Sequence, residues 1–163
     1  MNGKNNYGEY DKTVVVKAER KELGFNPATI SEGLPGGFLV YKSGGDEEIL
    51  FANTQLIEMY ECEDLEDFRN FTNNSFKGCV LPEDYEIIEK AIAKEVKKGD
   101  GYDYVQYRAK TKKGNDIIVE DYGRLKHSTN DGDLFYVFMI DYKHREKLYH
   151  KFIEDIHKHW EKD

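Results

Sequence analysis

Apolar and polar residues alternate along residues 102–111 and 116–126, and this two-residue period predicts β-strands. Residues 134–140 are apolar without interruption, which predicts a central strand covered on both faces. Segments 113–115 and 130–133, rich in Gly, Asn and Asp, predict tight turns between these strands. The positions that share one face are Val105, Tyr107 and Ala109 in the first stretch and Ile117, Val119, Asp121, Gly123 and Leu125 in the second.

Shorter patterns fill the first half of the chain. Residues 37–42 and 49–52 fit two strands, joined by a turn whose adjacent glycines permit positive φ. Residues 54–60 and 65–71 predict two short helices. A further short helix is predicted to begin at Pro27, because proline is favoured at the first helical position.

One longer amphipathic helix is predicted over residues 83–98. Ile88, Ile92 and Val96 recur there at four-residue spacing and define one apolar face. The helix separates the early hairpin from the three later strands. The whole pattern therefore predicts an α+β fold with a five-stranded antiparallel sheet and helices between its second and third strands.

A last amphipathic helix is predicted over residues 143–160. Its apolar positions are Tyr149, Phe152, Ile153, Ile156 and Trp160. This stripe suits packing on the sheet or pairing with a second chain as a short coiled coil. His157 and His159 fit a solvated helix face better than a metal site, because metal sites usually add Cys or carboxylate ligands in a fixed frame.

Composition narrows the class of protein. With 24 basic and 32 acidic residues the formal charge is −8, and the basic face that nucleic-acid binding needs is not evident. No stretch approaches the roughly 18 consecutive apolar residues of a spanning helix. The polar residues 1–6 lack the apolar region of a signal peptide. We therefore expect a cytoplasmic protein, with Cys62 and Cys79 reduced and half-buried.

Five short motifs occur in a defined order. They are Leu-Pro-Gly-Gly at 34–37, Asn53 after the second strand, Leu-Pro-Glu-Asp at 81–84, Tyr-Arg-Ala-Lys-Thr-Lys-Lys-Gly at 107–114 and Asp-Tyr-Lys at 141–143. Each motif alone is weak, but their joint order and spacing resemble a PAS domain. The resemblance covers roughly residues 30–146, most of the chain.

The resemblance implies a sensory role. It suggests three parts: a partly flexible N-terminal extension (1–29), a PAS-like sensor domain (30–142) and a C-terminal signalling helix (143–163). Such a module binds a small molecule or partner and relays a conformational change to an effector in a longer protein. That effector is a diguanylate cyclase, a histidine kinase or a transcription regulator. Asn53 is expected to fix the turn after the hairpin, and Asp141 to anchor the output helix.

Departures from the family bear on the cofactor. Flavin-binding members carry a Cys within an Asn-Cys-Arg-Phe-Leu-Gln motif, whereas residues 73–79 here read Asn-Asn-Ser-Phe-Lys-Gly-Cys. Haem-binding members often place a His on the long helix, and residues 83–98 contain none. Neither flavin nor haem is therefore supported, and the ligand is unknown.

Candidate pocket residues follow from the face assignments. A carboxylate such as Asp121 on an inward face needs a partner, so it indicates either a polar pocket or a solvated position near the sheet edge. The residues predicted to line the pocket are Ile88, Val105, Tyr107, Ala109, Val119 and Asp121.

Two alternatives to a ligand-binding sensor follow from the same residues. The many Tyr and Phe residues on strand faces fit a ligand-free PAS dimerisation module, with the core filled by side chains and a homodimer as the functional form. Gly-Gly-Asp-Glu-Glu at 44–48 resembles the GGDEF signature of diguanylate cyclases, but the fifth residue is Glu48 and no metal-binding Asp segment precedes it. We therefore expect no enzymatic activity.

Overall fold

The computed structural model describes residues 27–128 and 130–162. The chain divides into two units, residues 1–34 and residues 35–163. In the first unit, helix α2 (Pro27–Glu32) begins at the predicted proline. The rest of the predicted N-terminal extension lies outside the described residues, so the proposed domain boundaries stay a prediction.

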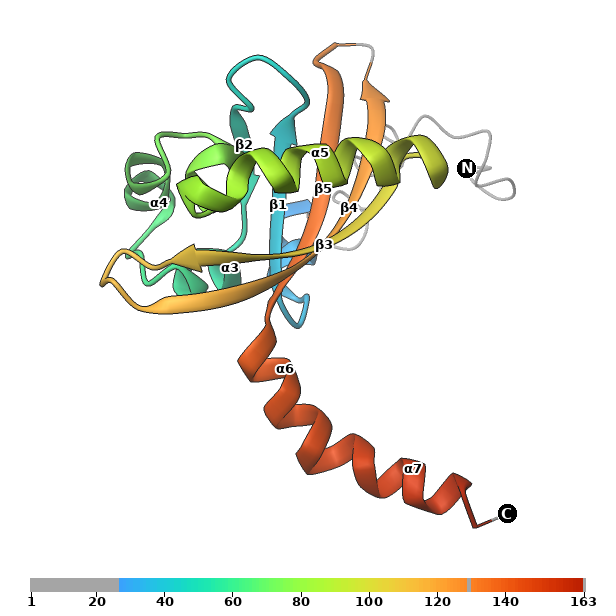
Figure 1. The fold of residues 1–163 in the computed structure, drawn as a ribbon. Helices are drawn as coiled ribbons and strands as arrows, with labels where there is room; N and C mark the ends of the chain where they lie inside the picture. Colours follow the sequence, from blue (N-terminus) through green and yellow to red (C-terminus); the bar gives the residue numbers. More distant parts are fainter. Residues whose placement is uncertain (1–26, 129, 163) are drawn as a thin grey trace, which may run out of the picture. The chain divides into compact units, whose positions relative to one another are not determined.

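Five antiparallel strands form one sheet in the second unit (Figure 1). Their order is β2-β1-β5-β4-β3, so the first hairpin joins the later meander through β1 and β5. The predicted number and direction of strands are confirmed. The bounds are β1 Gly37–Lys42, β2 Ile49–Ala52, β3 Tyr102–Lys110, β4 Asp116–Ser128 and β5 Gly132–Asp141.

Helices between β2 and β3 cover one face of this sheet, which we call the inner face. The longest, α5, crosses in front of the strands in Figure 1 and buries Ile88 and Ile92 against them. Burial alternates strictly along β3, because every second side chain points toward the helices. The bounds are α3 Thr54–Met59, α4 Leu65–Phe71, the 3-10 turn η1 Phe76–Cys79 and α5 Pro82–Lys98.

Asn53 ties the first hairpin to α3. Its Oδ1 accepts hydrogen bonds from the backbone N–H groups of Phe38 at 2.8 Å and Leu56 at 3.1 Å. Its Nδ2 donates to the carbonyl oxygen of Gly36 at 3.0 Å. The side chain caps the helix and holds the start of β1 at the same time, so a single buried amide orients both elements.

The last two strands differ from the predicted ones. Each runs two residues further into the connecting turn than the pattern predicts, and Gly132 at that turn has a φ of 76°. The prediction that residues 134–140 are covered on both faces is wrong, because Tyr136 is 40% exposed on the outer face. Its exposure reflects an aromatic outer surface, where the rings of Tyr104 and Tyr122 also meet at 4.7 Å.

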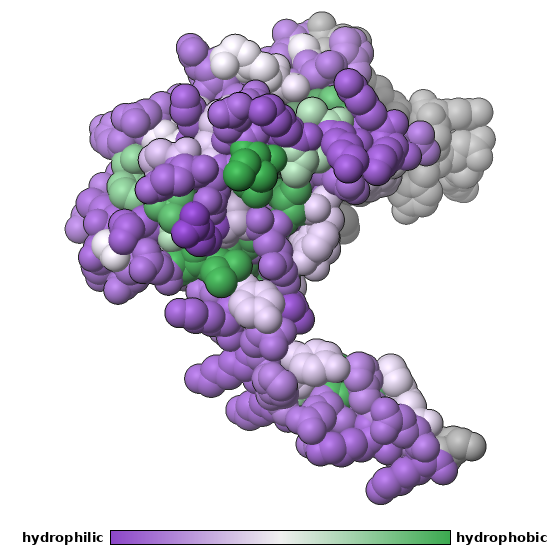
Figure 2. All heavy atoms as spheres, viewed as in Figure 1, coloured by the Kyte–Doolittle hydropathy of each residue, from purple (hydrophilic) through white to green (hydrophobic). Residues whose placement is uncertain are grey.

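The C-terminal amphipathic helix is interrupted. Helix α6 (Tyr142–Leu148) is followed by a π-helical turn, η2 (Tyr149–Ile153), and by α7 (Glu154–Trp160). The extra residue of a π turn changes the direction in which later side chains point. Much of this segment is hydrophilic on the side seen in Figure 2. The exposed apolar residues are Leu148, Phe152, Ile153, Ile156 and Trp160.

Within residues 27–128 and 130–162, no helix combines the length and apolar character that a membrane span needs. Around the sheet, hydrophilic residues dominate the visible surface, and apolar residues emerge only in small areas (Figure 2). Most of the buried apolar residues form one core between the helices and the inner face of the sheet.

Candidate functional site

Two carboxyl groups lie on the inner face of neighbouring strands. Asp103 on β3 is 7% exposed, and Asp121 on β4 is 1% exposed. The Tyr107 hydroxyl donates a hydrogen bond to Oδ2 of Asp121 at 3.1 Å. Among the described residues, both oxygens of Asp103 and Oδ1 of Asp121 have no hydrogen-bond partner. A buried carboxylate without a hydrogen-bond partner destabilises the folded protein. Both groups of this pair therefore require further hydrogen-bond donors.

The same environment raises the proton affinity of both groups. Burial, and then the charge of Glu95, raise the pKa of Asp103 from 3.8 to about 6. Burial, and then the charge of Asp103, raise the pKa of Asp121 well above its usual value, while the Tyr107 hydrogen bond opposes the shift. Two mutually repelling acids of this kind are stabilised by a proton or by a cationic group.

Gly123 provides the space that Asp103 occupies. The two residues are directly paired across β3 and β4. A Cβ atom on Gly123 would lie 2.4 Å from Oδ2 of Asp103, so the carboxyl group lies over the glycine. Any larger residue at position 123 must displace the carboxyl group.

A cavity of about 330 Å³ lies between α5 and the inner face of the sheet. This volume is at the lower end of the range for small-molecule sites. The ring of Tyr41 forms part of its wall and stacks on Phe76 at 4.5 Å and on Phe135 at 5.0 Å, measured between ring centroids. Its main apolar walls are Tyr41, Phe76, Ile92, Val96, Leu125 and Phe135.

The predicted pocket residues are all buried on the inner side. Their side chains belong to the packed core or, for Asp121, to the acid pair, and none lines the 330 Å³ cavity. Their role in binding therefore stays a prediction. Asp103 is absent from the predicted set, although the alternation of β3 places it on the same face two residues before Val105. The residues are Ile88 on α5, Val105, Tyr107 and Ala109 on β3, and Val119 and Asp121 on β4.

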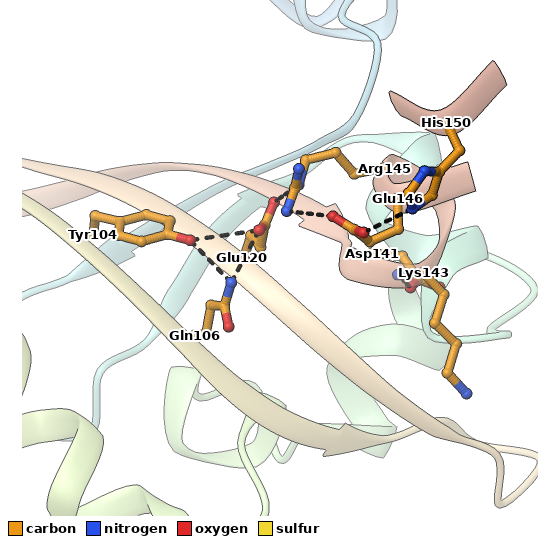
Figure 3. Close-up of polar contacts among 8 residues, drawn as sticks. All are labelled: Tyr104, Gln106, Glu120, Asp141, Lys143, Arg145, Glu146 and His150. Atoms are coloured by element: carbon orange, nitrogen blue, oxygen red, sulfur yellow. Dashed lines mark hydrogen bonds and ion pairs between the residues drawn. The ribbon is translucent and has the colours of Figure 1, made fainter. Parts of the chain in front are cut away.

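A third buried carboxylate, Glu120, points to the outer face, and both of its oxygens accept hydrogen bonds. It is 1% exposed, and Oε2 accepts a hydrogen bond from Nε of Arg145 at 2.7 Å. Its Oε1 accepts from Nε2 of Gln106 at 3.0 Å and from the Tyr104 hydroxyl at 3.4 Å (Figure 3). Arg145 lies on α6, so this cluster fastens the C-terminal helix to β3 and β4. Periodicity alone does not pair residues so far apart in sequence.

Asp141 lies at the base of the same helix. Its Oδ1 accepts a hydrogen bond from the backbone N–H of Lys143 at 2.9 Å, which makes Asp141 the N-cap of α6 (Figure 3). The structure thus places Asp141 where the helix leaves β5. Its part in signalling stays a prediction.

The Gly-rich turn and the two cysteines are less suited to catalysis, metal binding or redox chemistry. Gly44 and Gly45 adopt positive φ in the turn between β1 and β2. In the described part of the chain, no three His, Cys, Asp or Glu residues lie close enough together to hold a metal ion. Cys79 is buried, and burial raises the pKa of its thiol well above the usual value. Burial likewise raises the pKa of Cys62 to about 11. Both thiols are therefore protonated near neutral pH and poorly reactive.

The fold is similar to several solved PAS domains. One, from a LuxR-family transcriptional regulator of Burkholderia thailandensis in complex with ethanol, is 16% identical with a TM-score of 0.57 and covers 73% of this chain and 99% of its own. A second, from an HTR-like protein of Haloarcula marismortui, is 16% identical with a TM-score of 0.56 and covers 77% and 96%. A third, from a two-component sensor histidine kinase, is 12% identical with a TM-score of 0.52 and covers 77% and 97%.

Sequence comparison adds nothing to this likeness, since neither a protein-family model nor a curated protein matches the chain. The structural evidence is the sheet order β2-β1-β5-β4-β3, the helices inserted between β2 and β3, and the near-complete coverage of these PAS domains. On this evidence, the chain has the PAS fold.

Proposed function

We propose that this chain is a sensory domain that binds a small molecule on the inner face of its sheet and signals through its C-terminal helix. One observation carries the proposal. Adjacent residues of β4 face opposite sides: Asp121 points inward with an unpartnered oxygen, and Glu120 points outward and holds Arg145 of α6. A change at the inner face is thus one residue away from the attachment of the helix.

The transmission follows from the geometry of a β-strand. Successive side chains point to opposite faces, so a shift or twist of β4 at Asp121 also moves Glu120. Glu120 is held within hydrogen-bond distance of Arg145, and a small displacement weakens that bond. A ligand biases the equilibrium only by binding one arrangement of β4 more tightly than the other.

The structural neighbours support this proposal. The regulator domain from Burkholderia thailandensis holds ethanol, a small molecule, and the other neighbours include a domain of a sensor histidine kinase. For this chain we propose an effector of that kind in a longer protein: a histidine kinase, a transcription regulator or a diguanylate cyclase.

Native mass spectrometry of the purified protein beside a denatured control tests for a retained ligand. Extra mass that disappears on denaturation supports the sensor. Hydrogen exchange of residues 142–148, measured with and without that ligand, then tests the relay. Unchanged exchange in α6 on ligand binding would contradict the role of the Glu120–Arg145 pair.

A ligand-free dimerisation module is a second candidate, because the outer face of the sheet is aromatic. Four tyrosines there are 40–52% exposed, a larger apolar surface than scattered single residues. A dimer without extra mass, dissociated by replacing these side chains with serine, would favour this candidate. The residues are Tyr102, Tyr104, Tyr122 and Tyr136.

A further inference from the structure

Within the described residues, the groups that surround the inner acid pair, Asp103 and Asp121, carry no positive charge. Asp103 lies opposite Gly123 in the register of β3 and β4, and Asp121 lies opposite Val105, so the two acids are diagonal neighbours on the inner face. The titratable groups around the pair are Glu95 on α5, Tyr107 on β3, Tyr41 on β1, Tyr60 at the end of α3 and Cys79 in η1, and β5 adds the uncharged Val137 and Met139. Glu95 is a further acid, and the tyrosine and cysteine side chains provide no cation. In this part of the chain, the charge of the pair is therefore removed by a bound proton.

The hydrogen bonds of the pair leave room for such protons. Oδ2 of Asp121 accepts a hydrogen bond from the Tyr107 hydroxyl at 3.1 Å, whereas Oδ1 is buried without a partner among the described residues. A neutral carboxyl group carries its proton on one oxygen and still accepts hydrogen bonds. Oδ1 of Asp121 can therefore hold a proton while the Tyr107 bond is kept. Neither oxygen of Asp103 is bonded, so its protonation also breaks no hydrogen bond.

The inner acids and the outer cluster around Glu120 are built from adjacent residues of the same two strands. The adjacent inner and outer residues are Asp103 and Tyr104, Tyr107 and Gln106, and Asp121 and Glu120. The outer members meet at the carboxylate that accepts the hydrogen bond of Arg145 (Figure 3). Because successive side chains of a strand point to opposite faces, a displacement of the inner acids also displaces the outer cluster.

We propose that the inner acid pair is a proton-binding site, and that release of the Asp103 proton to solvent loosens the hydrogen bond between Glu120 and Arg145. This inference rests on the relay in the proposed function and adds the proton as a second signal beside the small molecule. Asp103 releases its proton first, because it lies on the edge strand β3 and is 7% exposed, against 1% for Asp121.

The direction of the response follows from the cost of a buried charge. Ionised Asp103 has no donor at its position over Gly123, so it moves toward water or draws water inward, and either change shifts β3 against β4. Burial raises the pKa of Asp103 to about 6, so the neutral form is favoured at lower pH and is lost as pH rises through that value. Helix α6 is therefore held more tightly at pH 5.5 than at pH 7.5.

Carbon-13 NMR of the side-chain carboxyl groups tests the proton-binding site. The whole chain is labelled at aspartate, and Asp103→Asn and Asp121→Asn identify the two signals. At pH 5.5 we expect both acids to give the signal of a neutral carboxyl group. As pH rises, the Asp103 signal should change to that of a carboxylate with a midpoint of about 6.

The Nε–H signal of Arg145, identified by its loss in Arg145→Lys, tests the response of α6. After correction for the intrinsic effect of pH, we expect its exchange with water to be about threefold faster at pH 7.5 than at pH 5.5. Asp103→Asn should keep the slow exchange at both pH values, whereas Asp116→Asn, which alters an exposed carboxyl on β4, should behave as the parent. All proteins carry His144→Gln and His150→Gln, because these histidines lie in or beside α6 and histidine commonly changes charge in this range.

The outcomes separate this inference from the small-molecule proposal. Carboxylate signals from both acids at pH 5.5 overturn the proton-binding site, while a ligand retained in native mass spectrometry would still support the sensor. A titrating Asp103 with an unchanged Arg145 signal overturns the pH control of α6 and contradicts the relay, but not ligand binding. A response of Arg145 that persists in Asp103→Asn overturns the role of Asp103. A response that is lost in Asp103→Asn supports the inference, even for a protein that retains no small molecule.

Discussion

Glu120 and Asp121 are neighbours in β4 and equally buried, but they differ in the number of hydrogen-bond donors around them. On the outer face, Arg145, Gln106 and Tyr104 donate hydrogen bonds to Glu120. On the inner face, Asp121 accepts one hydrogen bond from Tyr107 and lies near a second acid, Asp103. Burial by itself therefore says little about the role of a carboxyl group. The number of donors within reach decides whether it holds the fold together or destabilises it.

The difference predicts opposite responses to substitution. A buried carboxylate that has a cationic partner becomes unstable when that partner is removed. When a buried carboxylate has no such partner, removing its own charge stabilises the folded protein. Substitutions on the two faces of β4 should therefore change the free energy of unfolding in opposite directions.

The largest effect is expected for Arg145→Ala. It leaves Glu120 buried without its cation, and we expect a loss of about 2–3 kcal/mol in the free energy of unfolding, measured by urea denaturation. Lys158→Ala is the control, because its ion pair with Glu154 is exposed and worth about 0.5 kcal/mol or less. Adding Glu120→Gln to Arg145→Ala should recover part of the loss. Equal effects of Arg145→Ala and Lys158→Ala would remove the distinction between the two faces.

The next effect is expected for Gly123→Ala. The new methyl group would meet Oδ2 of Asp103 at 2.4 Å and displace the carboxyl group, with a loss of about 1–2 kcal/mol. In an Asp103→Ala background the same change should be neutral or slightly stabilising, since alanine lowers the entropy of the unfolded chain. A double-mutant cycle in urea measures this coupling. Additive effects would show that Asp103 does not lie over Gly123.

A smaller effect of opposite sign is expected for Asp103→Asn. Removing the unpaired charge should stabilise the protein by about 1 kcal/mol at pH 7.5, seen as a higher thermal midpoint. Asp116→Asn, which alters only an exposed ion pair with Lys110, should stay within about 0.5 kcal/mol of the parent protein. Destabilisation by Asp103→Asn would indicate that the carboxylate already has a cationic partner.

The smallest effect concerns pH. The pKa of Asp103 is about 6 in the folded protein against the usual 3.8, so the folded state binds more protons between these values. Its contribution to stability therefore increases as pH falls from 7 through 6. We expect a gain of about 0.5–1 kcal/mol between pH 7 and 5, reduced by solvent screening near the sheet edge. The groups around Asp103 are Glu95, Asp121 and Tyr41.

A thermal-shift series at constant ionic strength measures this dependence. Asp67 and Asp84 have pKa values lowered by Lys112 and Arg108, so their contributions are lost only at more acidic pH. Asp103→Asn should flatten the profile between pH 7 and 5, whereas Asp116→Asn should preserve it. A parent protein that is less stable at pH 5.5 than at pH 7.5 would contradict the unpaired state of Asp103.

Periodicity determined most of the fold, because side-chain direction repeats every two residues in strands and every 3.6 in helices. The alternation of residues 102–111 placed Val105, Tyr107 and Ala109 on the buried face, and the stripe of α5 placed Ile88 and Ile92 there. The unbroken apolar run at 134–140 carried less information. It did not show that Tyr136 faces solvent, since an apolar run has no polar positions to mark its outer face.

By itself, the sequence determined that five strands form the sheet, with a set of helices inserted between the second and the third, and that Asp121 shares a face of its strand with Val119. Tertiary structure alone decided which donors each buried acid meets. Arg145 reaches Glu120 from a helix 25 residues later, and Gly123 lies opposite Asp103 only through the register of β3 and β4. Local patterns specify the direction of a side chain, whereas its partners depend on where distant segments of the chain come together.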